Sequence, residues 1–69
     1  MTEFLSETRD GVLFLTFNRP AARNALTFAM YEGLRAACSA IPEDGSVRAV
    51  VIAGAGGKAF AAGTDMRQF

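Results

Sequence analysis

A glycine-rich loop and the small residues after it are the part of the sequence whose composition could bind an anion. The cluster Gly54-Ala55-Gly56-Gly57 follows the apolar run 47–53, and the stretch 58–66 follows the cluster. This stretch ends at Thr64-Asp65-Met66, where the residue types are typical of a helix start. A strand that runs through small residues into a helix start can direct backbone N–H groups at a negatively charged ligand atom. We therefore expect an anion-binding turn here.

Two phosphate-binding patterns can be tested against the glycine cluster. A Walker A loop requires Ser or Thr after Gly-Lys and a further glycine five positions earlier, but Ala59 and Ile52 stand at those positions. The permissive dinucleotide pattern fits better, as Gly54-x-Gly56-x-x-Ala59 after a strand. However, the helix that must follow would contain Gly63 in its first two turns. A dinucleotide-binding oxidoreductase therefore stays an alternative, and a plain turn is favoured for the glycines themselves.

An earlier loop has a similar composition. Ala21-Ala22 and Asn24-Ala25 are small residues that would let a ligand approach the backbone closely, and Arg23 between them supplies a cation. An ordinary solvated loop charge explains Arg23 equally well.

Hydrophobic patterns predict the elements that position these loops. Alternation and β-branched or aromatic residues indicate strands at 4–9 and 12–17, joined by the hairpin signal Asp10-Gly11. Thr27 is a suitable N-cap for a helix that extends to roughly residue 40. A third strand, 48–53, is apolar on both faces, which predicts a buried strand. The order indicates an α/β fold with a helical crossover between the second and third strands.

The helix is expected to bury one apolar stripe. Cys38 and Tyr31 on this stripe are predicted to be core residues, as are most of the phenylalanines. The stripe comprises Met30, Tyr31, Leu34, Ala37, Cys38 and Ile41.

Composition excludes several classes of function. The chain has 69 residues and no formal net charge, with seven basic and seven acidic residues scattered along it, so no nucleic-acid surface is indicated. No apolar window is long enough for a membrane span. There is no His and one Cys, so neither a metal site nor an internal disulfide is expected, and the commonest general base is absent. The single Cys favours the cytoplasm.

Four motifs in order resemble the crotonase, or enoyl-CoA hydratase/isomerase, superfamily. The resemblance covers essentially the whole chain, and it is the combination of motifs that is specific. The motifs are Asn18-Arg19-Pro20, Asn24-Ala25-Leu26-Thr27, the strand 47–52 with Gly54-Ala55-Gly56, and Lys58-Ala59-Phe60-Ala61-Ala62-Gly63-Thr64-Asp65-Met66.

The resemblance implies a spiral of ββα units and an enzyme that binds acyl-CoA thioesters. Such enzymes stabilise an enolate or related oxyanion at the thioester carbonyl with two backbone N–H groups, and coenzyme A enters as substrate, with no separate cofactor. By position, the Thr64 N–H would be the first donor of this oxyanion hole. Many members have alanine at this position, which leaves the N–H donor in place and puts the substrate preference in question.

The resemblance also implies binding roles for other residues. Ala62, Gly63, Asp65 and Met66 would line the acyl and pantetheine path. Backbone groups around Arg23 and Ala25 would contact adenine and pantetheine, with Arg23 near a CoA phosphate.

The second oxyanion donor and the acid/base carboxylates would come from segments beyond Phe69. We therefore expect residues 1–69 to be the N-terminal fragment of a single crotonase-like domain, inactive by itself, in a protein that forms homotrimers or dimers of trimers. The alternative from a different class is a stand-alone small binding module.

Overall fold

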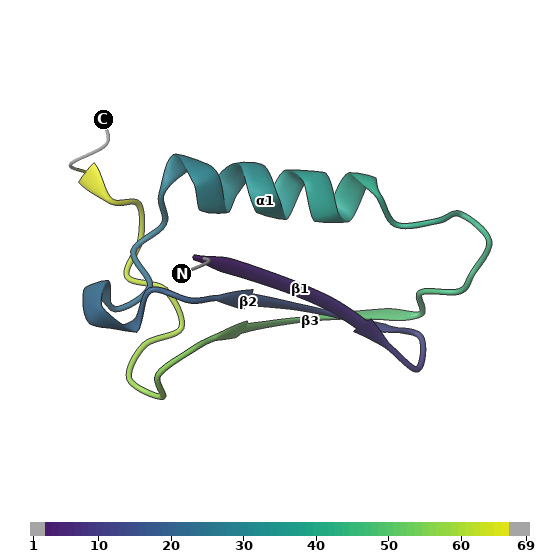
Figure 1. Cartoon of the computed structure of the whole chain (residues 1–69), viewed down its shortest axis with the longest axis horizontal. Helices are drawn as coiled ribbons and strands as arrows, with labels where there is room; N and C mark the ends of the chain where they lie inside the picture. The colour runs from purple at the N-terminus through teal and green to yellow at the C-terminus, as the bar shows by residue number, and fades with distance from the viewer. Residues whose placement is uncertain (1–2, 67–69) are drawn as a thin grey trace.

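The computed structural model describes residues 3–66, which form a three-stranded sheet with one α-helix on it. Figure 1 shows the helix running along one face of the sheet, with the end of the described chain beside its first turn. The elements in order are β1 (Phe4–Arg9), β2 (Val12–Phe17), the 3₁₀ turn η1 (Pro20–Ala22), α1 (Phe28–Ser39) and β3 (Ala49–Gly54). The predicted α/β class and all three strands are confirmed.

The hairpin between β1 and β2 closes through the predicted Asp10-Gly11 turn. Both residues have positive φ angles, 51° and 78°, as a two-residue hairpin loop of the primed type requires. The strands pair antiparallel with Arg9 opposite Val12.

β2 is the central strand, and its burial alternates along the chain. It pairs antiparallel with β1 and parallel with β3, with α1 as the connection to β3. Leu13, Leu15 and Phe17 are buried, while the residues between them are partly exposed. Together with Met30 of α1 these three residues form the core between helix and sheet.

α1 begins at the predicted cap. The Thr27 hydroxyl accepts a hydrogen bond from the Met30 N–H at 3.2 Å. The stripe facing the sheet is narrower than predicted, because Tyr31 and Cys38 are exposed. The helix packs closely on β1 at Gly33, where an added Cβ would lie 2.7 Å from the Phe4 ring. Tyr31 and Cys38 each follow a residue of the less exposed face, so their side chains point to one side of it. The less exposed helix positions are Met30, Gly33, Leu34 and Ala37.

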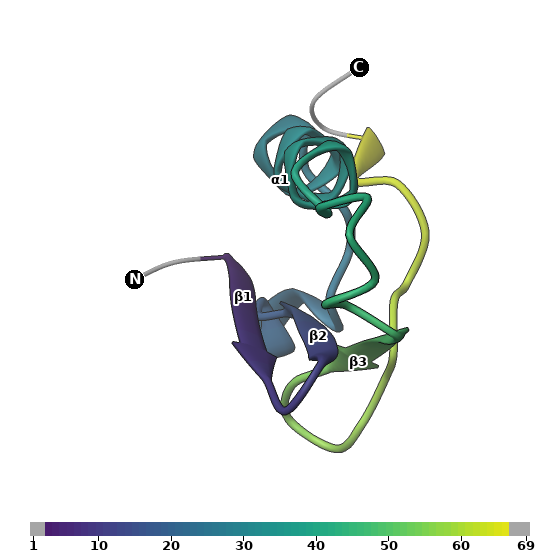
Figure 2. The ribbon, with the colours of Figure 1, turned by 90° about the vertical axis from the view of Figure 1, so that its right-hand side faces the viewer.

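The prediction of a buried third strand is wrong for this chain. Val50, Val51 and Ile52 are 41–43% exposed. β3 is an edge strand of the sheet, and α1 packs on β1 at the opposite edge. Figure 2, a view along the strands, shows β1, β2 and β3 side by side, with β3 at the edge of the sheet and α1 above it. An apolar sequence indicates that a strand can be covered on both faces, but the cover must come from other segments.

The loop predicted at 18–26 contains the short turn η1, which the sequence pattern did not predict. At the predicted helix start, Thr64 forms a β-bridge with Leu26 and Met66 has a 3₁₀ conformation. The continuation of that predicted helix lies outside the described residues. Between residues 3 and 66, no helix has the length and apolar character needed to cross a membrane.

Candidate functional site

The turn at Thr64 is held against Leu26 as a short piece of parallel β-structure. The Leu26 N–H donates to the Gly63 carbonyl at 2.8 Å, and the Asp65 N–H donates to the Leu26 carbonyl at 2.9 Å. In such a bridge the middle residue directs its own N–H to the opposite side. The Thr64 N–H therefore points away from Leu26, and it makes no hydrogen bond to another residue of the described chain.

Arg19 ties both sides of this bridge together. Its Nη1 donates to the Ala25 carbonyl at 2.7 Å and to Asp65 Oδ2 at 3.1 Å, and its Nε lies 3.3 Å from Glu3 Oε2. The side chains of Arg19 and Asp65 are only 16% and 6% exposed. Little solvent screens this ion pair, so it restrains the turn more strongly than a surface pair would. The sequence patterns did not predict this role for Arg19.

Asn24 joins the early loop to the glycine-rich loop. This fully buried side chain accepts a hydrogen bond from the Arg19 N–H at 2.8 Å. Its amide donates to the Ala55 carbonyl at 3.0 Å and the Ala59 carbonyl at 2.7 Å. Its φ of 59° is left-handed, a conformation that asparagine tolerates better than most residues. In the sequence, the signal for this loop-connecting role was an asparagine in a loop of small residues.

Replacing Asn24 by glycine is expected to destabilise the full-length protein by about 3 kcal/mol, because a buried side chain loses three hydrogen bonds. Glycine keeps the left-handed backbone, so the measured change reports the amide alone. Urea unfolding gives the free energy. Arg23→Gly is the matched control, since Arg23 is also left-handed, with φ 54°, but its side chain is exposed. Equal losses in the two variants would contradict the role of the Asn24 amide.

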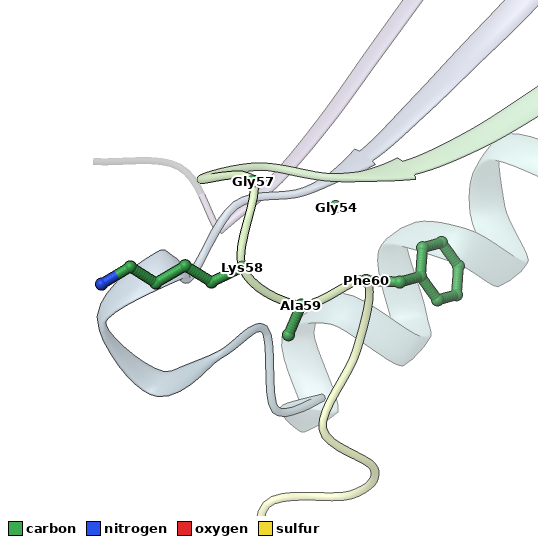
Figure 3. Close-up of a pocket in the computed structure, with 5 residues that line it drawn as sticks. All are labelled: Gly54, Gly57, Lys58, Ala59 and Phe60. Carbon is green, nitrogen blue, oxygen red and sulfur yellow. The ribbon is translucent and has the colours of Figure 1, made fainter.

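The glycine-rich loop serves packing at the end of β3. A Cβ added at Gly54 would lie 2.4 Å from the Phe60 carbonyl oxygen, so the loop doubles back too closely for any side chain. A shallow pocket of about 270 Å³ lies here, lined by Gly54, Gly57, Lys58, Ala59 and Phe60. Figure 3 shows the Lys58 side chain extending away from this pocket.

No helix follows the glycine cluster before residue 63, whereas a dinucleotide fingerprint requires one there. The glycines therefore form a turn, and the dinucleotide alternative is not supported.

The residues predicted to line the acyl path differ in how they are placed. Ala62, Gly63 and Met66 are exposed, and Thr64 is half-buried. The Asp65 carboxylate faces Arg19, and the Asp65 N–H donates to the Leu26 carbonyl.

In the predicted CoA-binding loop, the backbone N–H groups are already used inside the protein. Those of residues 22 to 26 each donate to a backbone carbonyl. The Arg23 side chain is exposed. A ligand could therefore contact carbonyl oxygens and one cation in this loop, but not its N–H groups.

Exposed charged groups on α1 and in the turn after it have shifted pKa values. A hydrogen bond from Arg35, together with its charge, lowers the pKa of the Glu32 carboxyl, and the same contact raises the pKa of Arg35. A hydrogen bond from Ser46 lowers the pKa of Asp44. These are contacts between exposed residues two or three positions apart in the sequence.

A family model described as enoyl-CoA hydratase/isomerase matches residues 12–69. The chain belongs to this family. The resemblance seen in the motifs is thereby confirmed.

Curated relatives from distant organisms support the enoyl-CoA hydratase/isomerase assignment. A probable enoyl-CoA hydratase of Rhizobium meliloti is 45% identical over 64 residues, which cover 93% of this chain and 24% of that protein. A probable 3-hydroxyisobutyryl-CoA hydrolase of Arabidopsis thaliana is 45% identical, over 94% of this chain and 17% of that protein. The chain thus spans about a quarter or less of the length of these relatives.

Solved structures of this family have the same fold over this region. A probable enoyl-CoA hydratase/isomerase from Mycobacterium abscessus aligns with a TM-score of 0.86 and 45% identity, over 97% of this chain and 26% of that one. The hairpin, helix and third strand therefore align with about a quarter of the Mycobacterium abscessus chain.

Proposed function

We propose that residues 1–69 form the N-terminal part of a single crotonase-like domain in an acyl-CoA-binding enzyme of the enoyl-CoA hydratase/isomerase type. Family membership and the match to about a quarter of each relative support this proposal. The two named relatives are a probable hydratase and a probable hydrolase, so the family leaves the reaction open. Hydratase activity is the first to test.

The orientation of the Thr64 N–H is the observation that carries the proposal. The bridge to Leu26 uses the N–H of Asp65 and the carbonyl of Gly63, which leaves the Thr64 N–H directed outward. When the thioester carbonyl gains negative charge in an enolate or tetrahedral intermediate, a fixed N–H stabilises that charge without having to reorganise. A second N–H donor and the groups that move protons are expected from other segments of the enzyme.

Arg19 and Asn24 are proposed as positioning residues for this donor. Arg19 contacts the carbonyl of Ala25 and the carboxylate of Asp65, on the two sides of the bridge. Asn24 hydrogen-bonds to Ala55 and Ala59 in the loop before Thr64, and so connects that loop to the loop before Leu26. Their network limits the directions that the Thr64 N–H can take.

The early loop is proposed to bind the CoA moiety. Those carbonyl oxygens of the loop that accept no hydrogen bond within residues 3–66 can accept from the adenine amino group, and Arg23 can approach a phosphate. Ala62, Gly63, Asp65 and Met66 are proposed to line the path of the acyl and pantetheine groups.

Removing the Arg23 cation is expected to weaken acyl-CoA binding. A solvent-exposed charge contact contributes about 1 kcal/mol, so Arg23→Ala should raise the Kd about fivefold. Isothermal titration of crotonyl-CoA into the full-length protein measures this. Arg35→Ala is the control, because Arg35 is an exposed cation paired with Glu32 on α1. A wild-type protein that binds NAD but no CoA thioester would overturn the proposed function.

The finer expectations about the whole protein also remain proposals. A cytoplasmic location is proposed from the single Cys, and a homotrimer or dimer of trimers from the family resemblance. Light scattering on the full-length protein tests the oligomeric state.

A further inference from the structure

Two hydroxyl groups meet beside the proposed oxyanion donor. Tyr31 Oη is hydrogen-bonded to Thr64 Oγ1, which connects the first turn of α1 to the turn that carries the Thr64 N–H. The figures agree on this proximity, since the end of the described chain lies next to the beginning of α1 in both orientations (Figures 1 and 2). Tyr31 is 39% exposed, so the pair is accessible to a ligand.

The exposure of Tyr31 follows from its position on the helix. Met30 occupies the core position and is fully buried. Tyr31 follows it in the sequence, so its side chain leaves the helix in a different direction. Its ring therefore lies at the border of the core, and its hydroxyl reaches a residue 33 positions away in the sequence. The contact places a polar group where the helix pattern alone predicted an apolar one.

The pair retains hydrogen-bonding capacity after the two hydroxyls have bonded to each other. Each hydroxyl has one proton and two acceptor lone pairs, and their mutual hydrogen bond uses only one of the two protons. In the described part of the chain, neither hydroxyl makes a further hydrogen bond. One O–H donor therefore remains on one of the two hydroxyls, beside the residue that carries the proposed oxyanion N–H.

We propose that the Tyr31–Thr64 hydroxyl pair selects acyl groups that carry an oxygen substituent close to the thioester. This inference rests on the proposed function, because it takes the Thr64 N–H as the group that binds the thioester oxygen. Thr64 Oγ1 belongs to the same residue as that N–H, so the pair addresses the first few carbons of the acyl chain. A hydroxyl or keto oxygen there can accept the remaining proton. An alkyl chain would instead leave this donor without an acceptor, which is unfavourable once water is excluded.

The test compares two thioesters that differ by one hydroxyl, butyryl-CoA and 3-hydroxybutyryl-CoA. Isothermal titration of each into the full-length protein gives the ratio of their Kd values. The wild type is expected to bind 3-hydroxybutyryl-CoA more tightly. Tyr31→Phe and Thr64→Val each remove one hydroxyl and keep the side-chain shape. The hydroxyl that is left then lacks the partner that fixes the direction of its O–H, so each variant is expected to reduce this preference about fivefold, the effect of one neutral hydrogen bond.

Two further variants separate a hydroxyl pair from two independent contacts. The double variant Tyr31→Phe/Thr64→Val should lose little more preference than either single one, since residues that act as a unit are not additive. Thr64→Ser, which restores the hydroxyl, should recover most of the preference. An unchanged Kd ratio in both Tyr31→Phe and Thr64→Val would overturn this inference and leave the proposed function standing. Failure of the wild type to bind either thioester would overturn the proposed function itself.

Discussion

Gly63→Pro is expected to reduce kcat of the full-length enzyme by about 10²–10³-fold, the loss typical of one oxyanion donor. Gly63 has a φ of 86°, whereas proline fixes φ near −65°, so the turn cannot keep its conformation. The change must rotate the peptide between Gly63 and Thr64, which carries the Thr64 N–H. An added Cβ at Gly63 would meet nothing within 4 Å, so the effect comes from the backbone and not from a clash.

Thr64→Ala is the informative comparison, because it changes the side chain and keeps the N–H donor. It should retain most of the turnover of an alkyl substrate. Gly45→Pro is the matched control for backbone strain, since Gly45 also has a positive φ, 83°, and open space around it, but lies in the exposed turn after α1. Steady-state kinetics of the three variants distinguishes an effect of the backbone N–H from an effect of the Thr64 side chain. Equal losses of kcat for Gly63→Pro and Thr64→Ala would contradict the role of the backbone.

Arg19→Gln is expected to destabilise the full-length protein by about 3–5 kcal/mol, the range found when one partner of a buried ion pair is removed. The substitution takes away the cation that faces the buried Asp65 carboxylate, together with the hydrogen bond to the Ala25 carbonyl. The restraint on the Leu26–Thr64 bridge is lost with it. Urea unfolding should show the lower stability, and kcat should fall more than KM rises, because the donor orientation is affected.

Asp65→Asn should cost less than Arg19→Gln. The amide oxygen of asparagine can still accept from Arg19, and Arg19 keeps its contacts with Glu3 and the Ala25 carbonyl. Arg35→Gln is the matched control, because it removes the same chemical group from the exposed pair with Glu32, where the effect on stability should be too small to measure. A similar destabilisation by Arg19→Gln and Arg35→Gln would show that the Arg19 pair has no special role.

The pattern of residues along the chain was sufficient to predict the three strands, the helix α1 and the family. Asp10-Gly11 specifies a hairpin because both residues tolerate positive φ, and Thr27 caps α1 through its own hydroxyl. Both signals act over a few neighbouring residues, which is why they can be read without a structure. The four motifs identified the family for a different reason, since their combination is specific even where each motif is not.

The tertiary structure decided which residues meet at the turn and which faces are covered. Arg19 and Asp65 are 46 positions apart, and no local pattern indicates that their side chains pair. The Leu26–Thr64 bridge likewise depends on where β3 and its loop return to the start of α1. Burial also depends on which segments pack against a residue, and for this reason the apolar strand β3 is exposed here. For the same reason Tyr31 is exposed, and its hydroxyl contacts Thr64. By itself, the sequence determined that the stretch from Lys58 to Met66 is a small-residue turn after a strand. The direction of the Thr64 N–H was decided by contacts between distant segments, because a backbone group is oriented by the groups that bond to its neighbours.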